Sequence, residues 1–106
     1  MTPEGKVKKR VKDILQPYIE RGELYANWPV PAGYGSPMLD AVCCHRGEFF
    51  MIETKVLKQL LTPRQELTRS EVLAAGGKVF VITGEVETDP DTWVGYTELE
   101  QWLSRK

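Results

Sequence analysis

The stretch MLDAVCCHRGEFFMIETKV, residues 38–56, decides the fold, because it reads as two β-strands joined by a very short turn. Each run, 38–45 and 48–56, is rich in β-branched, aromatic and other apolar residues, and only Arg46 and Gly47 separate them. So short a connection favours an antiparallel hairpin. We expect this hairpin to carry most of the side chains that matter for function.

On the amino-terminal side, residues 2–21 repeat apolar side chains at steps of three and four, which predicts an amphipathic helix. Thr2 supplies its N-cap, and Pro17 is expected to kink the helix or to end its regular part early. The stretch 23–37 is rich in proline and glycine. We expect an irregular loop there, with one short strand near residues 24–30.

On the carboxyl-terminal side, a second helix is expected from Thr62 to about Ala75. An unbroken apolar run then predicts that 78–83 is a strand buried on both faces. Thr97 and Glu100 form a capping-box pattern before a short terminal helix. The order is helix, strand, strand, strand, helix, strand, helix, which predicts an α/β (α+β) fold with a mixed sheet flanked by helices.

Length and composition set the broad class. A chain of 106 residues with 42% hydrophobic and 27% charged residues is expected to form one globular domain over residues 1–106. The net charge of −1 argues against a protein held to nucleic acid by bulk positive charge. No apolar run approaches the ~20 residues of a membrane span, and the charged amino terminus is unlike a secretory signal. Because Cys43 and Cys44 are neighbours and form no disulfide framework, we expect a protein of the reducing cytoplasm.

Alternation along the second strand of the hairpin places Glu53 and Lys55 on one face, with Thr54 turned to the other. Asp40 lies on the partner strand, and the short turn lets it approach Glu53 across the ladder. Mg²⁺ prefers oxygen ligands, so Asp40, Glu53 and the Thr54 backbone carbonyl could hold one, with Lys55 acting on a nucleophile or on phosphate charge. This arrangement suits phosphodiester hydrolysis. An ordinary strand-face ion pair, with Asp40 as a turn residue, explains the spacing equally well.

Four motifs follow one another along residues 34–84. They are Gly35-Ser36-Pro37-Met38-Leu39-Asp40, Phe49-Phe50-Met51-Ile52-Glu53-Thr54-Lys55, Leu61-Thr62-Pro63-Arg64-Gln65 and Gly76-Gly77-Lys78-Val79-Phe80-Val81. In this order and spacing they resemble the PD-(D/E)xK nuclease superfamily, and more closely its VRR-NUC family. One departure is that the proline usually found directly before the first acid lies three residues earlier, at Pro37.

The resemblance implies a restriction-endonuclease-like core and a Mg²⁺-dependent endonuclease, in which Mn²⁺ can substitute, built on the same aspartate, glutamate and lysine. It implies that Glu4 of the first helix lies at the site, directly or through water, whereas the helix dipole alone would also favour an acid there. Gln65 is the third residue after Thr62, so a capping box explains it. The family places a glutamine at this point beside the catalytic strand, and both roles can hold together.

DNA is the substrate that the resemblance implies. A lone domain of this size has little surface for reading base sequence, so we expect branched DNA such as a Holliday junction, and a homodimer, as in junction resolvases similar to this family. Trp93, Tyr96 and Trp102 are expected to be core residues or contacts between the two copies. The expected phosphate contacts are Lys6, Lys9, Arg10, Lys58, Arg64 and Arg69. A basic run is also the ordinary composition of a solvated helix face.

Other interpretations stay open on the sequence alone. One is a nucleic-acid-binding or assembly module that keeps the nuclease fold without catalysis, and another is a small regulatory protein that binds no metal. A zinc site at Cys43, Cys44 and His45 is not expected, because consecutive strand residues alternate faces and no second cluster completes a tetrahedron. His45 ends a strand, so we expect it at the surface or against a phosphate.

Overall fold

A four-stranded mixed sheet forms the centre of the computed structural model, which describes residues 1–30 and 36–105. Gly35 of the first motif and part of the expected loop lie outside the described residues. The strands, in their order across the sheet, are β1 (Leu24–Asn27), β2 (Ala41–His45), β3 (Glu48–Val56) and β4 (Lys78–Gly84). β2 pairs antiparallel with β1 and β3, whereas β4 pairs parallel with β3.

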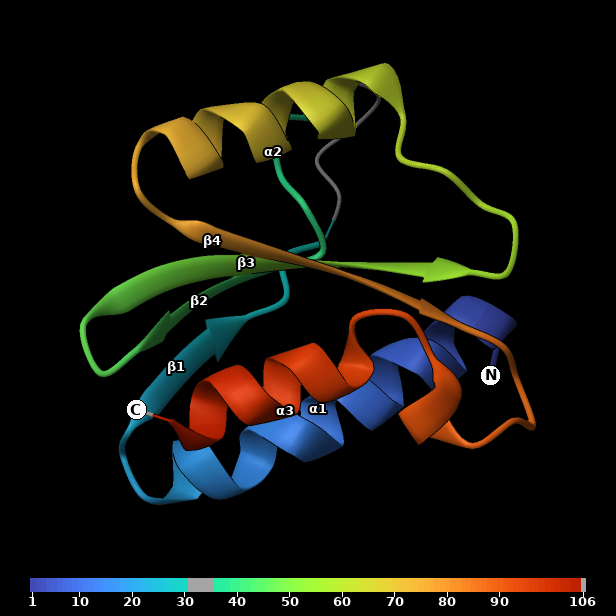
Figure 1. Ribbon diagram of the computed structural model, residues 1–106, viewed down its shortest axis with the longest axis horizontal. Coiled ribbons are helices and arrows are strands. Elements are labelled where there is room, and N and C mark those ends of the chain that lie inside the picture. The colour runs from blue at the N-terminus through green and yellow to red at the C-terminus, as the bar shows by residue number, and fades with distance from the viewer. Residues whose placement is uncertain (31–35, 106) are drawn as a thin grey trace.

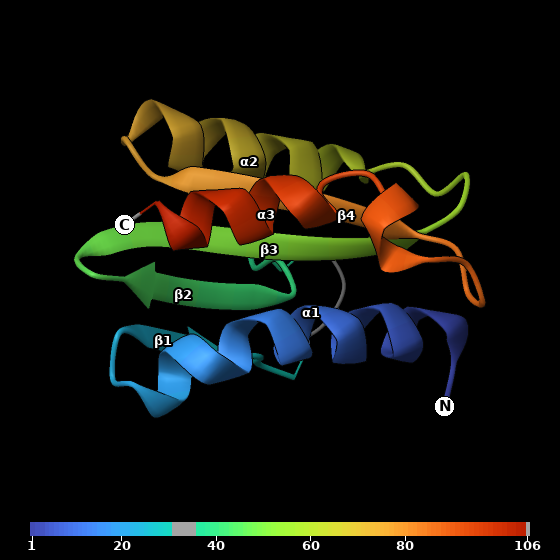
Figure 2. The ribbon, with the colours of Figure 1, turned by 60° about the horizontal axis from the view of Figure 1, so that its bottom comes forward.

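Helices cover both faces of this sheet. They are α1 (Pro3–Glu20), α2 (Pro63–Ala74) and α3 (Tyr96–Ser104), with a 3₁₀ turn, η1 (Pro90–Thr92), before α3. Helices α1 and α3 lie on one face and α2 lies on the other (Figure 1, Figure 2). This arrangement confirms the predicted order of elements and the α+β class. None of the described helices is long and apolar enough to cross a membrane.

The hairpin of β2 and β3 is confirmed. His45 pairs with Glu48, and the two residues between them, Arg46 and Gly47, have φ angles of 48° and 88°. A two-residue hairpin turn with positive φ at both central residues matches the natural twist of the strands. The turn fixes the register, so that Ala41 pairs with Ile52 near the other end of the hairpin.

The first helix is longer and more regular than expected at Pro17. The Thr2 hydroxyl caps it by accepting a hydrogen bond from the Gly5 N–H at 3.0 Å, but Pro17 lies inside the helix, which continues to Glu20. Pro17 is exposed and only one turn from the helix end, so a single backbone hydrogen bond is lost and the helix tolerates it.

The prediction that β4 is buried on both faces was wrong. β4 is the last strand in the sheet, and Val79, Phe80 and Val81 are only partly buried. An apolar run of this length cannot distinguish a central strand from an edge strand whose faces are only partly covered. An isolated bridge between Thr83 and Val94 pairs part of the open edge.

The capping box expected at Thr97 is also wrong, because α3 begins at Tyr96, two residues earlier than a Thr97 N-cap requires. Gly95 is its N-cap with φ 85°, and no side chain caps the helix. A Cβ at Gly95 would collide with the carbonyl oxygen of Val81, so the chain can enter α3 here only with glycine. Thr97 lies in the first turn of the helix instead.

His45 is fully buried, which contradicts the surface position expected for it. Its Nδ1 lies 3.0 Å from the Glu23 carbonyl oxygen and its Nε2 lies 3.2 Å from the Leu103 carbonyl oxygen. The Tyr18 and Trp102 rings pack around the imidazole. The end of α3 therefore covers the end of β2, a tertiary contact that the position of His45 beside a turn does not reveal.

The carboxyl-terminal aromatics belong to the core. Trp93 and Tyr96 are 7% and 9% exposed and contact one another, while Trp102 is partly buried against Phe50 and Phe80. These side chains fill the interior of their own chain, so the alternative of contacts with a second copy does not hold for Trp93 and Tyr96.

Candidate active site

Asp40 and Glu53 meet where β2 begins. Asp40 directly precedes Ala41, which pairs with Ile52, and the next residue along β3 is Glu53. The Asp40 N–H donates a hydrogen bond to Glu53 Oε1 at 3.0 Å. The hairpin therefore brings the two acids together, as strand geometry predicts.

The carboxylate of Asp40 is held against β3 through Thr54. Its Oδ2 accepts hydrogen bonds from the Thr54 N–H at 2.8 Å and from the Thr54 hydroxyl at 2.6 Å. The N–H and C=O of a strand residue point toward the same neighbouring strand, so the Thr54 carbonyl also points toward the side of Asp40, beyond the end of β2. The position of the Asp40 carboxylate is thus fixed by the main chain of the next strand.

Lys55 and Gln65 approach the same glutamate. Lys55 Nζ lies 3.6 Å from Glu53 Oε2, and the two side chains are 13% and 4% exposed. Gln65 at the start of α2 donates from Nε2 to Glu53 Oε2 at 3.1 Å. Its Oε1 accepts from the Thr62 N–H at 2.9 Å in a reciprocal capping box. Gln65 therefore caps α2 and also contacts Glu53 on β3.

Thr68, which the sequence did not single out, ties the segment before Asp40 to α2. Its buried hydroxyl donates a hydrogen bond to the Pro37 carbonyl oxygen at 2.8 Å. Thr68 follows Gln65 by three residues, so both lie on the same face of α2. That spacing was the available signal, since a polar residue one turn after Gln65 faces the same surroundings.

The amino-terminal end of α1 reaches the site through Lys8. Lys8 Nζ lies 3.6 Å from Asp40 Oδ1 and 4.0 Å from the Glu4 carboxylate, which is 44% exposed. Glu4 thus contacts the site through Lys8. The sequence did not single out Lys8, although a lysine four residues after Glu4 lies on the same side of the helix.

The charge environment of Glu53 is unfavourable for a carboxylate. Burial, and next the nearby negative charge of Asp40, raise the pKa of Glu53 to about 7, although Lys55 acts in the opposite direction. Glu4 contributes a further, smaller increase. A site in which buried carboxylates repel one another gains from an added cation.

The donor set fits a hard divalent cation such as Mg²⁺ in charge and chemistry. Within residues 1–30 and 36–105, no group of three aspartate, glutamate, cysteine or histidine side chains is arranged to bind a metal ion by itself. This includes Cys43 and Cys44. Mg²⁺ is commonly bound by one or two carboxylates, with water and substrate phosphate filling the other positions. Asp40 and Glu53 supply two carboxylates. Asp40 Oδ2 already accepts two hydrogen bonds from Thr54, whereas Glu53 Oε1 and Oε2 each accept one, so lone pairs remain on Asp40 Oδ1 and on both oxygens of Glu53.

The basic residues expected to contact DNA lie on several surfaces. Lys9 pairs with Asp13 at 3.1 Å, Arg64 with Glu71 at 3.6 Å and Arg69 with Glu66 at 3.7 Å, all partly or largely exposed. Lys58 is exposed in the loop after β3, with a φ of 71°.

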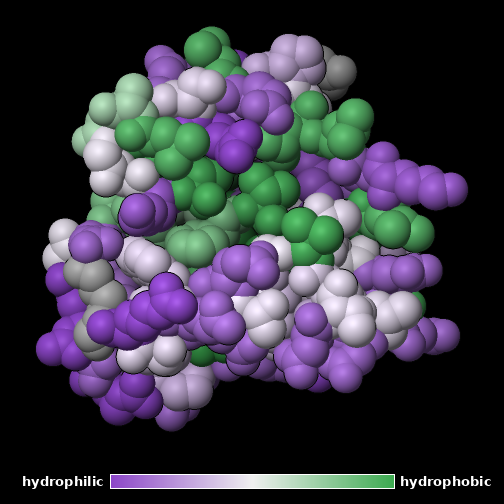
Figure 3. Space-filling model, viewed as in Figure 1, coloured by the Kyte–Doolittle hydropathy of each residue, from purple (hydrophilic) through white to green (hydrophobic). Residues whose placement is uncertain are grey.

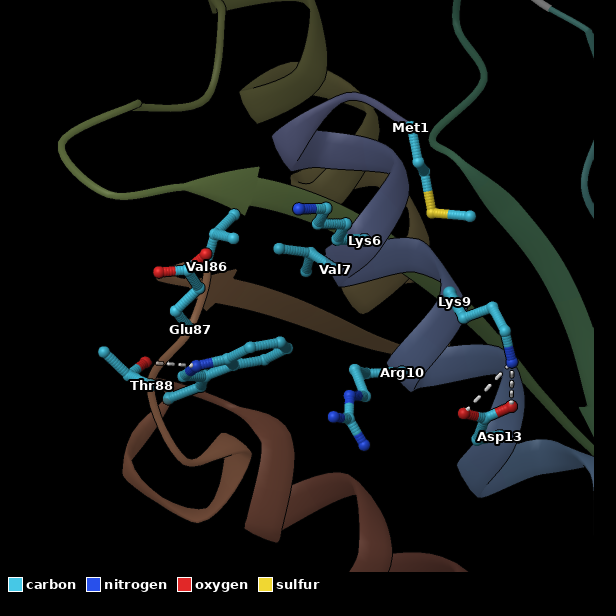
Figure 4. Close-up of a pocket in the computed structure, with 10 residues that line it drawn as sticks. Met1, Lys6, Val7, Lys9, Arg10, Asp13, Val86, Glu87 and Thr88 are labelled. Carbon is cyan, nitrogen blue, oxygen red and sulfur yellow. Dashed lines mark hydrogen bonds and ion pairs between the residues drawn. The ribbon is translucent and has the colours of Figure 1, made fainter.

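Lys6 and Arg10 line a cleft between α1 and residues 86–88 (Figure 4), and Lys8 does not line it. The two acids that line this cleft, Asp13 and Glu87, are exposed, and Asp13 is paired with Lys9, whereas Glu53 is buried. A buried carboxylate beside a lysine is found instead around Asp40 and Glu53, where Lys55 lies 3.6 Å from Glu53.

Comparison with known proteins gives the fold. No protein-family model matches the sequence, and no curated protein matches it. The structure is similar to a solved VRR_NUC domain, with a TM-score of 0.63 and 19% sequence identity over 98% of this chain and 97% of that chain. It is also similar to Hjc, a Holliday junction resolvase from Archaeoglobus fulgidus, with a TM-score of 0.52 and 19% identity over 81% of this chain and 72% of that chain. The protein therefore has the restriction-endonuclease-like fold of the VRR_NUC domain, which confirms at the level of the fold the resemblance seen in its sequence motifs.

Proposed function

We propose that this protein is a Mg²⁺-dependent endonuclease of the VRR-NUC family that hydrolyses phosphodiester bonds in DNA. One observation carries the proposal. Asp40, Glu53, Lys55 and Gln65 come from three separate segments and converge at the start of β2, on a fold shared with a VRR_NUC domain. A strand-face ion pair without function does not require a buried glutamate held by a lysine, a glutamine and a backbone N–H.

Asp40 and Glu53 are the proposed metal ligands, with the Thr54 carbonyl as a third oxygen and Glu4 acting through water. The support for this set is the raised pKa of Glu53 and the excess of negative charge beside it. A bound Mg²⁺ or Mn²⁺ supplies a water of lowered pKa and neutralises charge on the phosphodiester. The Thr54 hydroxyl and N–H keep the Asp40 carboxylate in one orientation.

Lys55 and Gln65 have separate proposed roles around Glu53. Lys55 extends from the same strand face and places an ammonium group where it can orient a nucleophile or stabilise charge developing on phosphate. Gln65 fixes the Glu53 carboxylate from α2, so its role is to position a ligand. Because Gln65 bonds both to Glu53 and to the Thr62 N–H, the first turn of α2 is fixed relative to the Glu53 carboxylate.

Branched DNA, such as a Holliday junction, is the proposed substrate. Two observations support this: one similar solved structure is a Holliday junction resolvase, and a chain of this size offers little surface for reading base sequence. Lys6, Arg10 and Lys58 are the strongest candidates for phosphate contacts, because no ion pair to an acid is found for them among the described side chains, whereas Lys9, Arg64 and Arg69 are each paired with an acid. Lys9, Arg64 and Arg69 would add weaker contacts at the surface.

A homodimer is the proposed active species, because two equivalent sites related by a two-fold axis suit paired cuts in opposite strands. The apolar surface available for pairing differs from the one expected. Apolar side chains gather over α2 and β4 (Figure 3), where Leu67 and Leu73 are 50% and 46% exposed. This surface, in place of Trp93 and Tyr96, is where a second copy would pack.

Cleavage of defined DNA substrates tests the proposal. Purified protein is incubated with labelled linear duplex, flap and four-way-junction DNA, with Mg²⁺, with Mn²⁺ and with chelator. We expect cleavage only with metal, fastest on the branched substrates. Binding without cleavage under all conditions would favour a non-catalytic nucleic-acid-binding module. The absence of both metal and DNA binding would favour a regulatory protein.

A further inference from the structure

Lys8 stands apart from the other lysines of α1 because it faces two acids of the site. Its Nζ lies 3.6 Å from Asp40 Oδ1 and 4.0 Å from Glu4, and its side chain is 33% exposed. The next residue, Lys9, turns away and pairs with Asp13 at 3.1 Å. Of these two adjacent lysines, Lys8 is paired with acids of the candidate site and Lys9 with an acid outside it.

The two oxygens of Asp40 are unequal, and Lys8 is beside the less occupied one. Oδ2 accepts two short hydrogen bonds from Thr54. The contact of Oδ1 with Lys8 at 3.6 Å is an ion pair longer than an ordinary hydrogen bond. Oδ1 is consequently the oxygen with free lone pairs, and Lys8 provides the positive charge next to it.

The charges of the site favour an added cation. Three carboxylates, on Glu4, Asp40 and Glu53, face two ammonium groups, on Lys8 and Lys55. Lys55 is largely buried on β3, whereas Lys8 is more exposed and lies at the end of a long side chain on a helix. Of the two, Lys8 is the one that can leave without exposing a buried group.

We propose that Lys8 is a displaceable counterion: it neutralises Asp40 while no divalent cation is bound, gives up that carboxylate when one binds, and then contacts a phosphate of the DNA. This rests on the proposed function, since it requires a divalent cation at Asp40. Glu4, four residues earlier on the same side of α1, keeps the released ammonium group at the rim of the site. Metal binding thus makes a phosphate contact available that the metal-free protein lacks.

Metal affinity without DNA tests the first half. Mg²⁺ is titrated calorimetrically at pH 7.5 and low salt into the wild type and into Lys8→Met, Lys8→Arg and the matched control Lys9→Met. Partly exposed ion pairs are weak, so we expect Lys8→Met to bind Mg²⁺ about two- to fivefold more tightly. Lys8→Arg should stay close to the wild type, and Lys9→Met should change much less than Lys8→Met.

Two results would overturn the proposal at this stage. In one, Lys8→Met binds Mg²⁺ no more tightly than the wild type, and in the other Lys9→Met gives an equal gain, which would indicate a general charge effect. If the wild type binds no Mg²⁺, the metal-dependent function fails together with this inference. Normal binding by the wild type with no effect of Lys8→Met removes the inference alone.

DNA binding in the presence and absence of metal tests the second half. Lys8→Met is combined with Lys55→Ala to prevent cleavage, and binding to labelled junction DNA is followed by fluorescence anisotropy. With Mg²⁺ we expect a several-fold loss of affinity relative to Lys55→Ala alone, and a salt dependence shallower by about one phosphate contact. With chelator the two proteins should bind alike, because Lys8 is then engaged by Asp40. Equal losses under both conditions would contradict displacement and indicate a fixed role for Lys8.

Discussion

The two faces of the sheet are built differently although they share the same strands. On the face covered by α1 and α3, Phe50 and Ile52 are fully buried and belong to one continuous hydrophobic cluster. On the face covered by α2, Met51 and Glu53 are also buried, but neither belongs to that cluster. Alternate residues of β3 therefore have different roles: Phe50 and Ile52 build the hydrophobic core, whereas Glu53 on the other face belongs to the candidate site.

The helices differ in the same way. α1 buries Val7, Val11 and Leu15 completely, whereas Thr68 is the one buried residue of α2, and it is polar. Most of the hydrophobic burial that stabilises the protein therefore lies on the sheet face under α1 and α3. The face under α2 can then hold charged groups close together. The following predictions test this division, from the largest expected effect to the smallest.

Replacing Glu53 or Lys55 with alanine should affect function most. Cleavage is expected to fall by about 10³-fold in both, equivalent to about 4 kcal/mol of transition-state stabilisation. Mg²⁺ affinity should be lost with Glu53→Ala and largely retained with Lys55→Ala, because Lys55 acts on the nucleophile or phosphate. Calorimetry and single-turnover cleavage separate the two, with Glu66→Ala on the exposed side of α2 as control. Normal Mg²⁺ binding by Glu53→Ala would remove Glu53 from the ligand set.

Replacing Phe50 with alanine should cost the most stability. Phe50 is fully buried and contacts the rings of Phe80 and Trp102, so the loss is expected to be about 3–5 kcal/mol. Leu67→Ala, at an exposed position of α2, should change stability by no more than about 0.5 kcal/mol in the monomer. Urea unfolding measures both. Similar losses in the two variants would contradict the division between the faces.

The free energy of unfolding should depend on pH because the pKa of Glu53 is raised in the folded protein. The folded protein, with a Glu53 pKa of about 7, retains a proton that the unfolded chain, with a value near 4.5, has released. The folded state binds more protons between these values, so the metal-free protein should lose stability as pH rises from about 5 to about 7.5, by up to roughly 3 kcal/mol. Urea unfolding across this range should show the decline in the wild type and a flatter profile in Glu53→Gln. An identical decline in both would assign it to other groups.

Thr68→Val should lose little stability and still reduce activity. Loss of the hydrogen bond to the Pro37 carbonyl is expected to cost about 1 kcal/mol. Because this bond anchors the segment before Asp40, cleavage should also fall several-fold. Ser70→Ala, at an exposed position of the same helix, is the matched control. An unchanged cleavage rate in Thr68→Val would show that Asp40 is positioned without this anchor.

The sequence predicted the parts of the fold that local patterns determine. The periodicity of α1, the two-residue turn of the hairpin and the alternation that places Glu53 beside Lys55 are all properties of neighbouring residues. The Asp40 position was also predictable, since the turn fixes the register of the hairpin. These features account for most of the candidate site.

Features set by distant contacts could not be predicted in this way. His45 is buried because the end of α3 covers it, and β4 is an edge strand because no later strand pairs with its outer side. Lys8 and Thr68 became visible only when α1 and α2 were placed around the hairpin. Lys8 contacts Asp40, and Thr68 contacts Pro37, and in both pairs the partners are more than thirty residues apart in the sequence.

The most direct test of a cation site at Asp40 and Glu53 is the thermal unfolding midpoint with Mg²⁺ and with chelator at pH 8. Binding to the folded state alone should raise stability by about 1.4 kcal/mol when Mg²⁺ exceeds its dissociation constant about tenfold, which corresponds to several degrees in a domain of this size. We predict this rise in the wild type and its loss in Asp40→Asn. An unchanged midpoint in the wild type, at Mg²⁺ concentrations well into the millimolar range, would contradict the account.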